Sequence, residues 1–199
     1  MCAACYASFR PIAAPLCALC GAPSAWPVAR CRECAGRRLA FVSARAPVAY
    51  AGPARALVRA WKERGLRRAA HLAAETVVAR LPVPAADVIA YIPPDADRLL
   101  LRGVHPAEAL ARELARAWGI ESAALLARRA GAHRQTGLDR AARLANARGA
   151  FTARGAVPER VVLVDDVYTT GATASAAAGA LRRSGAHSVH VVTFARTVR

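Results

Sequence analysis

Residues 161–173 read VVLVDDVYTTGAT, and this stretch decides the fold. Its first four residues are apolar and mostly β-branched, with polar residues beyond both ends, which predicts a strand buried on both faces of a parallel sheet. Asp165 and Asp166 follow at the carboxyl end of that strand, where ligands bind in open α/β sheets. The alanine-rich segment 174–183 and the glycine that comes soon after it predict a helix with a glycine stop.

The turn from Thr169 to Thr173 joins this strand to this helix. Backbone N–H groups at a helix start, together with threonine hydroxyls, can hold a phosphate, and glycine lets the backbone approach it closely. Two adjacent carboxylates just upstream suit a ribose diol, a hydrated magnesium ion, or both. The spacing leaves one alternative open, an ordinary strand–turn–helix in which Asp166 or Thr170 merely caps the helix.

Length and charge set outer limits on the function. The chain has 199 residues, which suits one domain with a small appendage. Lysine and arginine number 29 against 13 acidic residues, and the net charge of +16 by itself indicates a polyanionic partner. However, Lys62 is the only lysine and alanine is very frequent, which indicates a coding bias toward arginine and weakens that evidence.

No stretch reaches the roughly 18 uninterrupted apolar residues of a membrane span. Cysteines also stand where a signal peptide would need an apolar core. We therefore expect a cytoplasmic protein without membrane insertion.

All six cysteines lie in residues 1–38, as three Cys-x-x-Cys pairs. Pairs at this spacing form the knuckles that wrap a tetrahedral zinc ion, which predicts a small zinc-binding module ahead of a main domain at 39–199. The two pairs with the shorter intervening loop make the better structural zinc site: Cys17, Cys20, Cys31 and Cys34. Cys2 and Cys5 are the less suitable ligands and are expected to be half of a second site. Free or redox-active thiols are the alternative.

The rest of the chain alternates between predicted helices and strands. Helical spacing covers 54–81, with a break near Gly65, and 106–118, while short apolar runs predict strands at 87–92, 120–127 and 187–194. Lys62 lies between the two helical pieces, as a surface lysine or a phosphate contact. The strand at 87–92 ends in a polar turn that is a second candidate ligand-facing edge, with Pro94, Asp95 and Arg98.

Residues 128–146 are basic and polar, with few apolar positions. We expect a flexible loop over 128–137 that closes over an anion, whereas 139–148 suits such a loop and a solvated helix equally. The candidate loop residues are Arg128, Arg134, Gln135, Arg140 and Arg143.

The pattern of hydrophobics, two acids and Thr-Thr-Gly-x-Thr at 161–173 resembles the signature by which type I phosphoribosyltransferases bind phosphoribosyl diphosphate (PRPP). Nearly the whole chain resembles the ComF/GntX family of competence-related, phosphoribosyltransferase-like proteins. Further carriers of that resemblance are the cysteine pairs, Tyr50 with Lys62, Pro93 with Arg98, Arg102-Gly103, Gln135, Arg140, Arg143, and Asn146 with Phe151.

The resemblance implies an α/β fold of the type I phosphoribosyltransferase kind, a parallel sheet flanked by helices with an N-terminal zinc knuckle. It implies that Asp165 and Asp166 hold the ribose hydroxyls and organise Mg²⁺, and that the 5′-phosphate lies in the turn 169–173. The implied catalytic residues are Asp165, Asp166 and Arg98. The implied PRPP-binding residues are Pro94, Asp95, Arg98, Asp165, Asp166, Val167, Tyr168, Thr169, Thr170, Gly171, Ala172 and Thr173.

One departure concerns residues 102–106, which read RGVHP where the family usually has Arg-Gly-Phe-Asn-Gln, so two side-chain amides are missing. The resemblance implies an enzyme that transfers phosphoribosyl to an unknown acceptor and is linked to DNA uptake. The alternative is a non-catalytic PRPP sensor, or a module that binds single-stranded DNA or a DNA-uptake helicase. A zinc-stapled protein with a vestigial pocket is the third interpretation.

Overall fold

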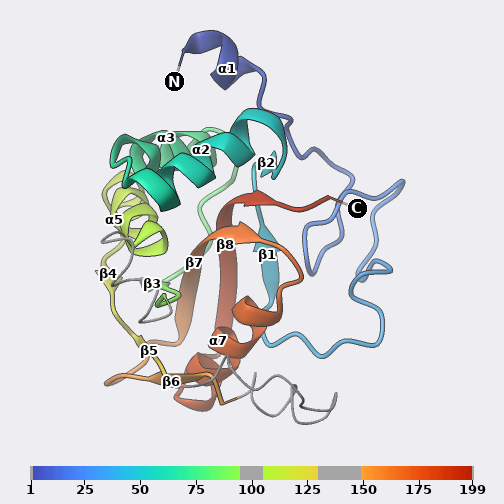
Figure 1. Ribbon diagram of the computed structural model, residues 1–199. Helices are drawn as coiled ribbons and strands as arrows, with labels where there is room; N and C mark the ends of the chain where they lie inside the picture. Colours follow the sequence, from blue (N-terminus) through green and yellow to red (C-terminus); the bar gives the residue numbers. More distant parts are fainter. Residues whose placement is uncertain (1, 95–104, 130–148, 199) are drawn as a thin grey trace, which may run out of the picture.

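The computed structural model describes residues 2–94, 105–129 and 149–198. A parallel sheet forms the centre of this part of the chain (Figure 1). Its strands lie in the order β1-β8-β7-β3-β4, and β2 pairs with the far end of β8. The strands are β1 (Ser43–Arg45), β2 (Val48–Ala49), β3 (Val88–Tyr91), β4 (Ser122–Ala123), β7 (Arg160–Tyr168) and β8 (Ser188–Arg196).

Strand β7 is buried on both faces, as the apolar run at its start predicts. Val161 and Leu163 belong to the core on one face of the sheet, and Val162 and Val164 belong to the core on the other. This alternation follows from the two-residue period of a strand. The strand is longer than expected, because its pairing with β8 continues to Tyr168. Asp165 and Asp166 are therefore part of β7 rather than of the turn after it.

Helices cover the two faces of the sheet separately. On one side α2 (Gly52–Arg64), α3 (Arg68–Val78) and α5 (Pro106–Trp118) pack together, and α3 and α5 contact the sheet. On the opposite side α7 (Ala172–Arg183) packs on β7 and β8 (Figure 1). Gly65 ends α2 with positive φ, which confirms the predicted break, and Gly119 ends α5 in the same way. None of the helices in the described ranges has the length and apolar character that a bilayer crossing needs.

The strand order creates a switch point between β3 and β7. From β3 the chain passes toward β4, on the side of the sheet away from β7. From β7 it runs through α7 to β8, in the opposite direction along the sheet. In an open α/β sheet, a crevice opens outside the carboxyl ends of two such neighbouring strands, and ligands bind there. The carboxyl ends of β3 and β7 are therefore where a ligand is expected to bind.

The single strand expected at 120–127 is two strands. β4 pairs with β3 at the edge of the main sheet, whereas β5 (Leu126–Arg128) pairs antiparallel with β6 (Phe151–Ala153). The reason is a change of direction after Ala123, whose carbonyl accepts a hydrogen bond from the N–H of Leu125.

The N-terminal segment packs along the β1 and β2 edge of the sheet. It begins with the short helix α1 (Ala3–Ala7). The N–H of Ala44 donates to the carbonyl of Leu19, and Pro11 forms a bridge with Val48. The fold class expected from the sequence is confirmed: a parallel sheet flanked by helices, with a small cysteine-rich module.

Candidate functional site

Two carboxylates occupy the carboxyl end of β7 in different surroundings. The side chain of Asp166 is 8% exposed, and its Oδ2 forms an ion pair with Nζ of Lys62, in the last turn of α2. Asp165 Oδ1 accepts a hydrogen bond of 2.9 Å from the backbone N–H of Asp166. Lys62, proposed from the sequence as a surface lysine or a phosphate contact, is one-third exposed and lies at the site as the counter-ion of Asp166.

Among the described residues, Asp165 has no such counter-ion. Burial and the neighbouring Asp166 charge raise its pKa to about 8, and Lys62 offsets only part of this effect. A raised pKa means that the folded protein favours the protonated carboxyl group. A bound cation, or hydroxyl groups that donate to Asp165, would favour the ionised form.

The turn after β7 has the geometry of an anion cradle. Gly171 has φ of +73° and is the N-cap of α7, and Thr170 Oγ1 accepts a hydrogen bond of 3.4 Å from the N–H of Ala172, in the first turn of that helix. The hydroxyl of Tyr168 lies where a Cβ at this position would be. Thr169, Thr170 and Thr173 are exposed around the turn. The threonine hydroxyls and the helix N-terminus together can hold a phosphate.

His105 is a site residue that sequence reasoning missed. It stands among the residues 102–106 that depart from the family pattern, and its Nδ1 accepts a hydrogen bond of 3.1 Å from the N–H of Glu108. The ring caps α5 and packs edge-on against Tyr91, at the end of β3. Burial lowers the pKa of His105, although Glu108 raises it. Only the N-cap position ahead of Pro106 could have indicated this role.

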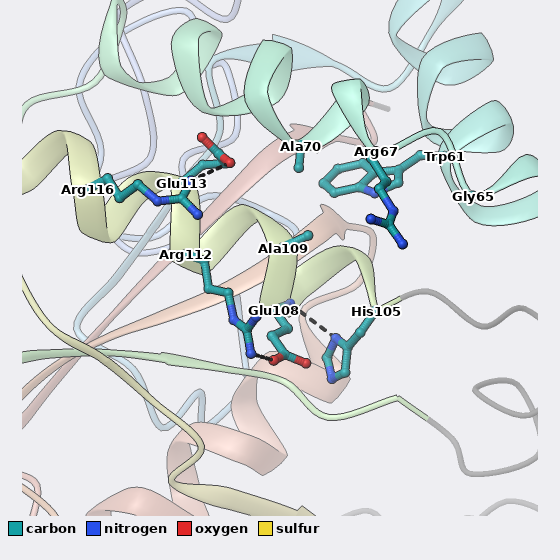
Figure 2. Close-up of a pocket in the computed structure, with 10 residues that line it drawn as sticks. All are labelled: Trp61, Gly65, Arg67, Ala70, His105, Glu108, Ala109, Arg112, Glu113 and Arg116. Carbon is teal, nitrogen blue, oxygen red and sulfur yellow. Dashed lines mark hydrogen bonds and ion pairs between the residues drawn. The ribbon is translucent and has the colours of Figure 1, made fainter.

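A groove of about 540 Å³ lies between α5 and the α2–α3 connection (Figure 2). Figure 2 shows His105 at one end and Trp61 on the opposite wall. Two glutamates of α5 on its floor are paired with arginines of the same helix, Glu108 with Arg112 at 2.5 Å and Glu113 with Arg116 at 2.6 Å. The groove is therefore largely charge-compensated. No sequence motif pointed to it, because it forms where separate helices meet.

The cysteine quartet converges as the spacing predicts. The sulfur atoms of Cys17, Cys20, Cys31 and Cys34 lie within 4.8 Å of one another. Four thiolates around a tetrahedral zinc ion lie about 3.8 Å apart, since each Zn–S bond is about 2.3 Å long. The quartet therefore fits zinc with little movement.

Backbone groups already favour the thiolate form at one corner of the quartet. The N–H groups of Cys20 and Cys31 point at Cys17 Sγ, at 3.5 and 3.3 Å. Burial alone would raise the pKa of Cys17, but these N–H groups and that of Leu19 lower it to about 7. Cys2 and Cys5 are exposed and lie apart from the cluster, at α1.

The structure brings many of the predicted residues together at the switch point. A small hollow of about 30 Å³ is lined by Asp165, Val167, Tyr168, Thr169, Gly171 and Thr173. Pro94 ends the described segment after β3, on the same edge of the sheet. Arg128, expected in a flexible loop, is the last residue of β5, where it stacks on Phe151 and donates to the carbonyl of Pro93. The other predicted residues lie outside the described ranges: Asp95, Arg98, Arg134, Gln135, Arg140 and Arg143.

Substitution of Gly171 tests the turn. In Gly171→Ala the methyl group meets the Tyr168 hydroxyl, whereas the equivalent methyl group at Gly155, φ +66°, meets nothing within 4 Å. The left-handed backbone costs about 1–2 kcal/mol in either alanine variant, and overpacking adds about 1–3 kcal/mol at Gly171 only. Denaturant unfolding should therefore give a clearly lower free energy of unfolding for Gly171→Ala than for Gly155→Ala. Equal losses would show that the Tyr168 hydroxyl does not constrain the turn.

The raised pKa of Asp165 predicts how stability depends on pH. Asp165 contributes most to the free energy of unfolding below its ordinary pKa of 3.8. That contribution falls as the pH rises and is lost once the pH has passed about 8. The wild type should therefore lose stability between pH 6 and pH 9, and Asp165→Asn should lose about 1–2 kcal/mol less over that range, because its amide stays neutral. Thermal unfolding at the two pH values measures this difference. If both proteins lose the same free energy of unfolding between these pH values, the raised pKa of Asp165 is refuted.

Comparison with protein-family models gives no match, and comparison with curated proteins gives none. Among solved structures, the chain is similar to the glutamine PRPP amidotransferase from B. subtilis complexed with ADP and GMP. The TM-score is 0.45 and the identity 25%, over 62% of this chain and 26% of that chain. It is also similar to the protein TT1426 from Thermus thermophilus, with TM-score 0.34 and 23% identity, over 66% of this chain and 73% of that one. Because both TM-scores are low, the site is interpreted from its own geometry.

Proposed function

We propose that the protein binds PRPP with magnesium at the switch point between β3 and β7. The observation that carries this proposal is the convergence of two acids and a glycine–threonine turn at the carboxyl end of one buried strand. The hollow at the turn has room for a few small atoms only, so the rest of a ligand would lie above it, along the open edge of the sheet. In PRPP the 5′-phosphate would lie at the turn, the ribose diol at the two carboxylates, and the diphosphate at the end of the neighbouring strand β3.

The donor set at the end of β7 fits magnesium. Mg²⁺ takes oxygen ligands and is usually held by one or two carboxylates together with substrate phosphates. Asp165, whose pKa is raised by burial and by the Asp166 charge, is the first candidate ligand. Asp166, which is paired with Lys62, is the second. When bound there, magnesium would offset the negative charge of the diphosphate.

For the reaction we propose transfer of the phosphoribosyl group to an acceptor. The bond from ribose C1 to the diphosphate breaks, the diphosphate leaves with the bonding electrons, and a nucleophilic atom of the acceptor bonds to C1. In this scheme Asp165 and Asp166 hold the ribose, the turn 169–173 holds the 5′-phosphate, and Arg98 with the basic segment 128–143 offsets the charge of the leaving group. The acceptor's chemistry is not identified. The link to DNA uptake rests on the family resemblance alone.

Calorimetric titration of PRPP tests this proposal. The wild type should bind PRPP with an affinity that depends on Mg²⁺, and Asp165→Asn/Asp166→Asn should bind at least about tenfold more weakly, because charge-assisted contacts to the ribose and the metal are lost. Asp87→Asn is the matched control, since Asp87 is an acid paired with Arg160 at the opposite, amino end of the same strands.

Absence of binding in the wild type with zinc and magnesium present would refute the proposal. Equal binding by the double variant would show that Asp165 and Asp166 do not contribute to PRPP binding. Release of diphosphate in a screen of nucleobase and nucleic-acid acceptors would then distinguish a transferase from a PRPP sensor.

A second candidate function, binding of single-stranded DNA, is favoured by one observation. Trp26, in the cysteine-rich module, is 68% exposed, which is unusual for so large an apolar side chain. Arg30, Arg32 and Arg38 of the same module are exposed as well. Single-strand binding combines an aromatic platform on which bases stack with cations that contact the phosphates. These exposed residues are also our candidates for contact with a DNA-uptake helicase partner.

Fluorescence anisotropy with a labelled oligothymidine tests this surface. Trp26→Ala should weaken binding by about 1–3 kcal/mol, since one stacking platform is lost. Affinity should fall steeply with salt. The Asp165→Asn/Asp166→Asn protein is the control and should bind the oligonucleotide like the wild type. Unchanged affinity in Trp26→Ala would refute the stacking role.

A further inference from the structure

A buried arginine connects the cysteine quartet to the end of the central sheet. Arg196, the last residue of β8, is 1% exposed. Its Nη1 donates to the carbonyl of Cys20, and its Nη2 lies 3.1 Å from Oε2 of Glu33, between Cys31 and Cys34. One guanidinium therefore joins both cysteine pairs of the quartet, which only a forked, planar cation can do.

The same guanidinium contacts Tyr168, at the end of β7. Its Cζ lies 5.1 Å from the centre of the tyrosine ring, within cation–π range. Phe41 packs edge-on against the same ring. Tyr168 is 5% exposed, and its hydroxyl lies directly against Gly171. The contacts therefore run without a gap from the cysteine quartet, through Arg196 and Tyr168, to the turn that starts α7.

Charge explains why an arginine is buried at this place. Zinc held by four thiolates carries a net charge of −2, and a buried charge is stable only when it is paired. Arg196 supplies one positive charge, which it shares with Glu33. Arg45 supplies a second, since its Nη2 donates to the carbonyl of Ala18, between Cys17 and Cys20. Within the described part of the chain, Arg45 has no hydrogen bond or ring contact with Tyr168, whereas Arg196 contacts both Tyr168 and the quartet.

We propose that Arg196 and Tyr168 are positioning residues that make the conformation of the turn 169–173 depend on the cysteine quartet. Arg196 holds the Tyr168 ring in place, and the ring holds Gly171 at the N-terminus of α7. The cysteine-rich module thus contributes to the phosphate site although none of its residues lines the hollow at the turn. The inference deepens the proposed PRPP function and names the side chains on which affinity for the phosphate group depends.

Amide hydrogen exchange tests the coupling without any ligand. The zinc-loaded wild type is compared with Arg196→Lys and Arg45→Lys, each with its zinc content measured. Both variants keep the charge and lose the guanidinium fork beside the same Cys17–Cys20 loop. The informative peptide spans residues 169–178, because the N–H of Ser175 donates to the carbonyl of Gly171 and reports opening of the turn.

In Arg196→Lys this peptide should exchange about tenfold faster than in the wild type, whereas in Arg45→Lys it should stay within about twofold. A peptide from α5, on the opposite face of the sheet, should not change in either variant. Equal exchange of 169–178 in the wild type and zinc-loaded Arg196→Lys would overturn the proposal, as would equal acceleration in both variants.

Titration with PRPP adds the functional readout. Arg196→Lys and Tyr168→Phe should each bind PRPP several-fold more weakly than the wild type, and Arg45→Lys should bind it equally well. If the exchange difference is found but the wild type does not bind PRPP, the coupling stands and the proposed ligand fails. If the wild type binds PRPP and all three variants bind it equally, the ligand stands and the positioning role fails.

Discussion

The structure depends on the pairing of β7 with a parallel neighbour on each side. Because this pairing continues with β8 to Tyr168, Asp165 and Asp166 lie near the carboxyl end of a central strand, where their backbone is already ordered. The conformational entropy of these residues is lost on folding rather than on binding a ligand, which favours affinity. The same ordering holds two carboxylates side by side in a partly buried place, and Lys62 compensates for the charge of Asp166.

Charge compensation takes two different forms in this protein. The only lysine of the chain lies against Asp166, and Asp165 is left with a raised pKa. This incomplete compensation suits a site that receives a cation together with its ligand. At the cysteine quartet two arginines, Arg45 and Arg196, offset part of the charge that four thiolates and zinc would carry together, and Arg196 also pairs with Glu33. There the compensating cations are residues of the protein itself.

The cysteine-rich module and the α/β domain share one hydrophobic core. Cys20 and Cys34 are buried in the same cluster as Phe41, Tyr168 and Leu181. The cysteine-rich segment ends near residue 38, but the hydrophobic core continues across that position. A module joined in this way can act on the neighbouring site through van der Waals contact, without a hinge or a moving part.

The sequence by itself determined the elements whose signal is local. The apolar run of β7, the glycine that ends α5 and the Cys-x-x-Cys spacing are local patterns, because strand burial, helix termination and zinc binding depend on near neighbours. Only the tertiary structure decided which distant residues meet. It placed Lys62 against Asp166, His105 at the end of β3, and Arg196 between the cysteine quartet and Tyr168. These contacts join residues far apart in the chain, and no periodicity encodes them, since they follow from the order in which the strands assemble.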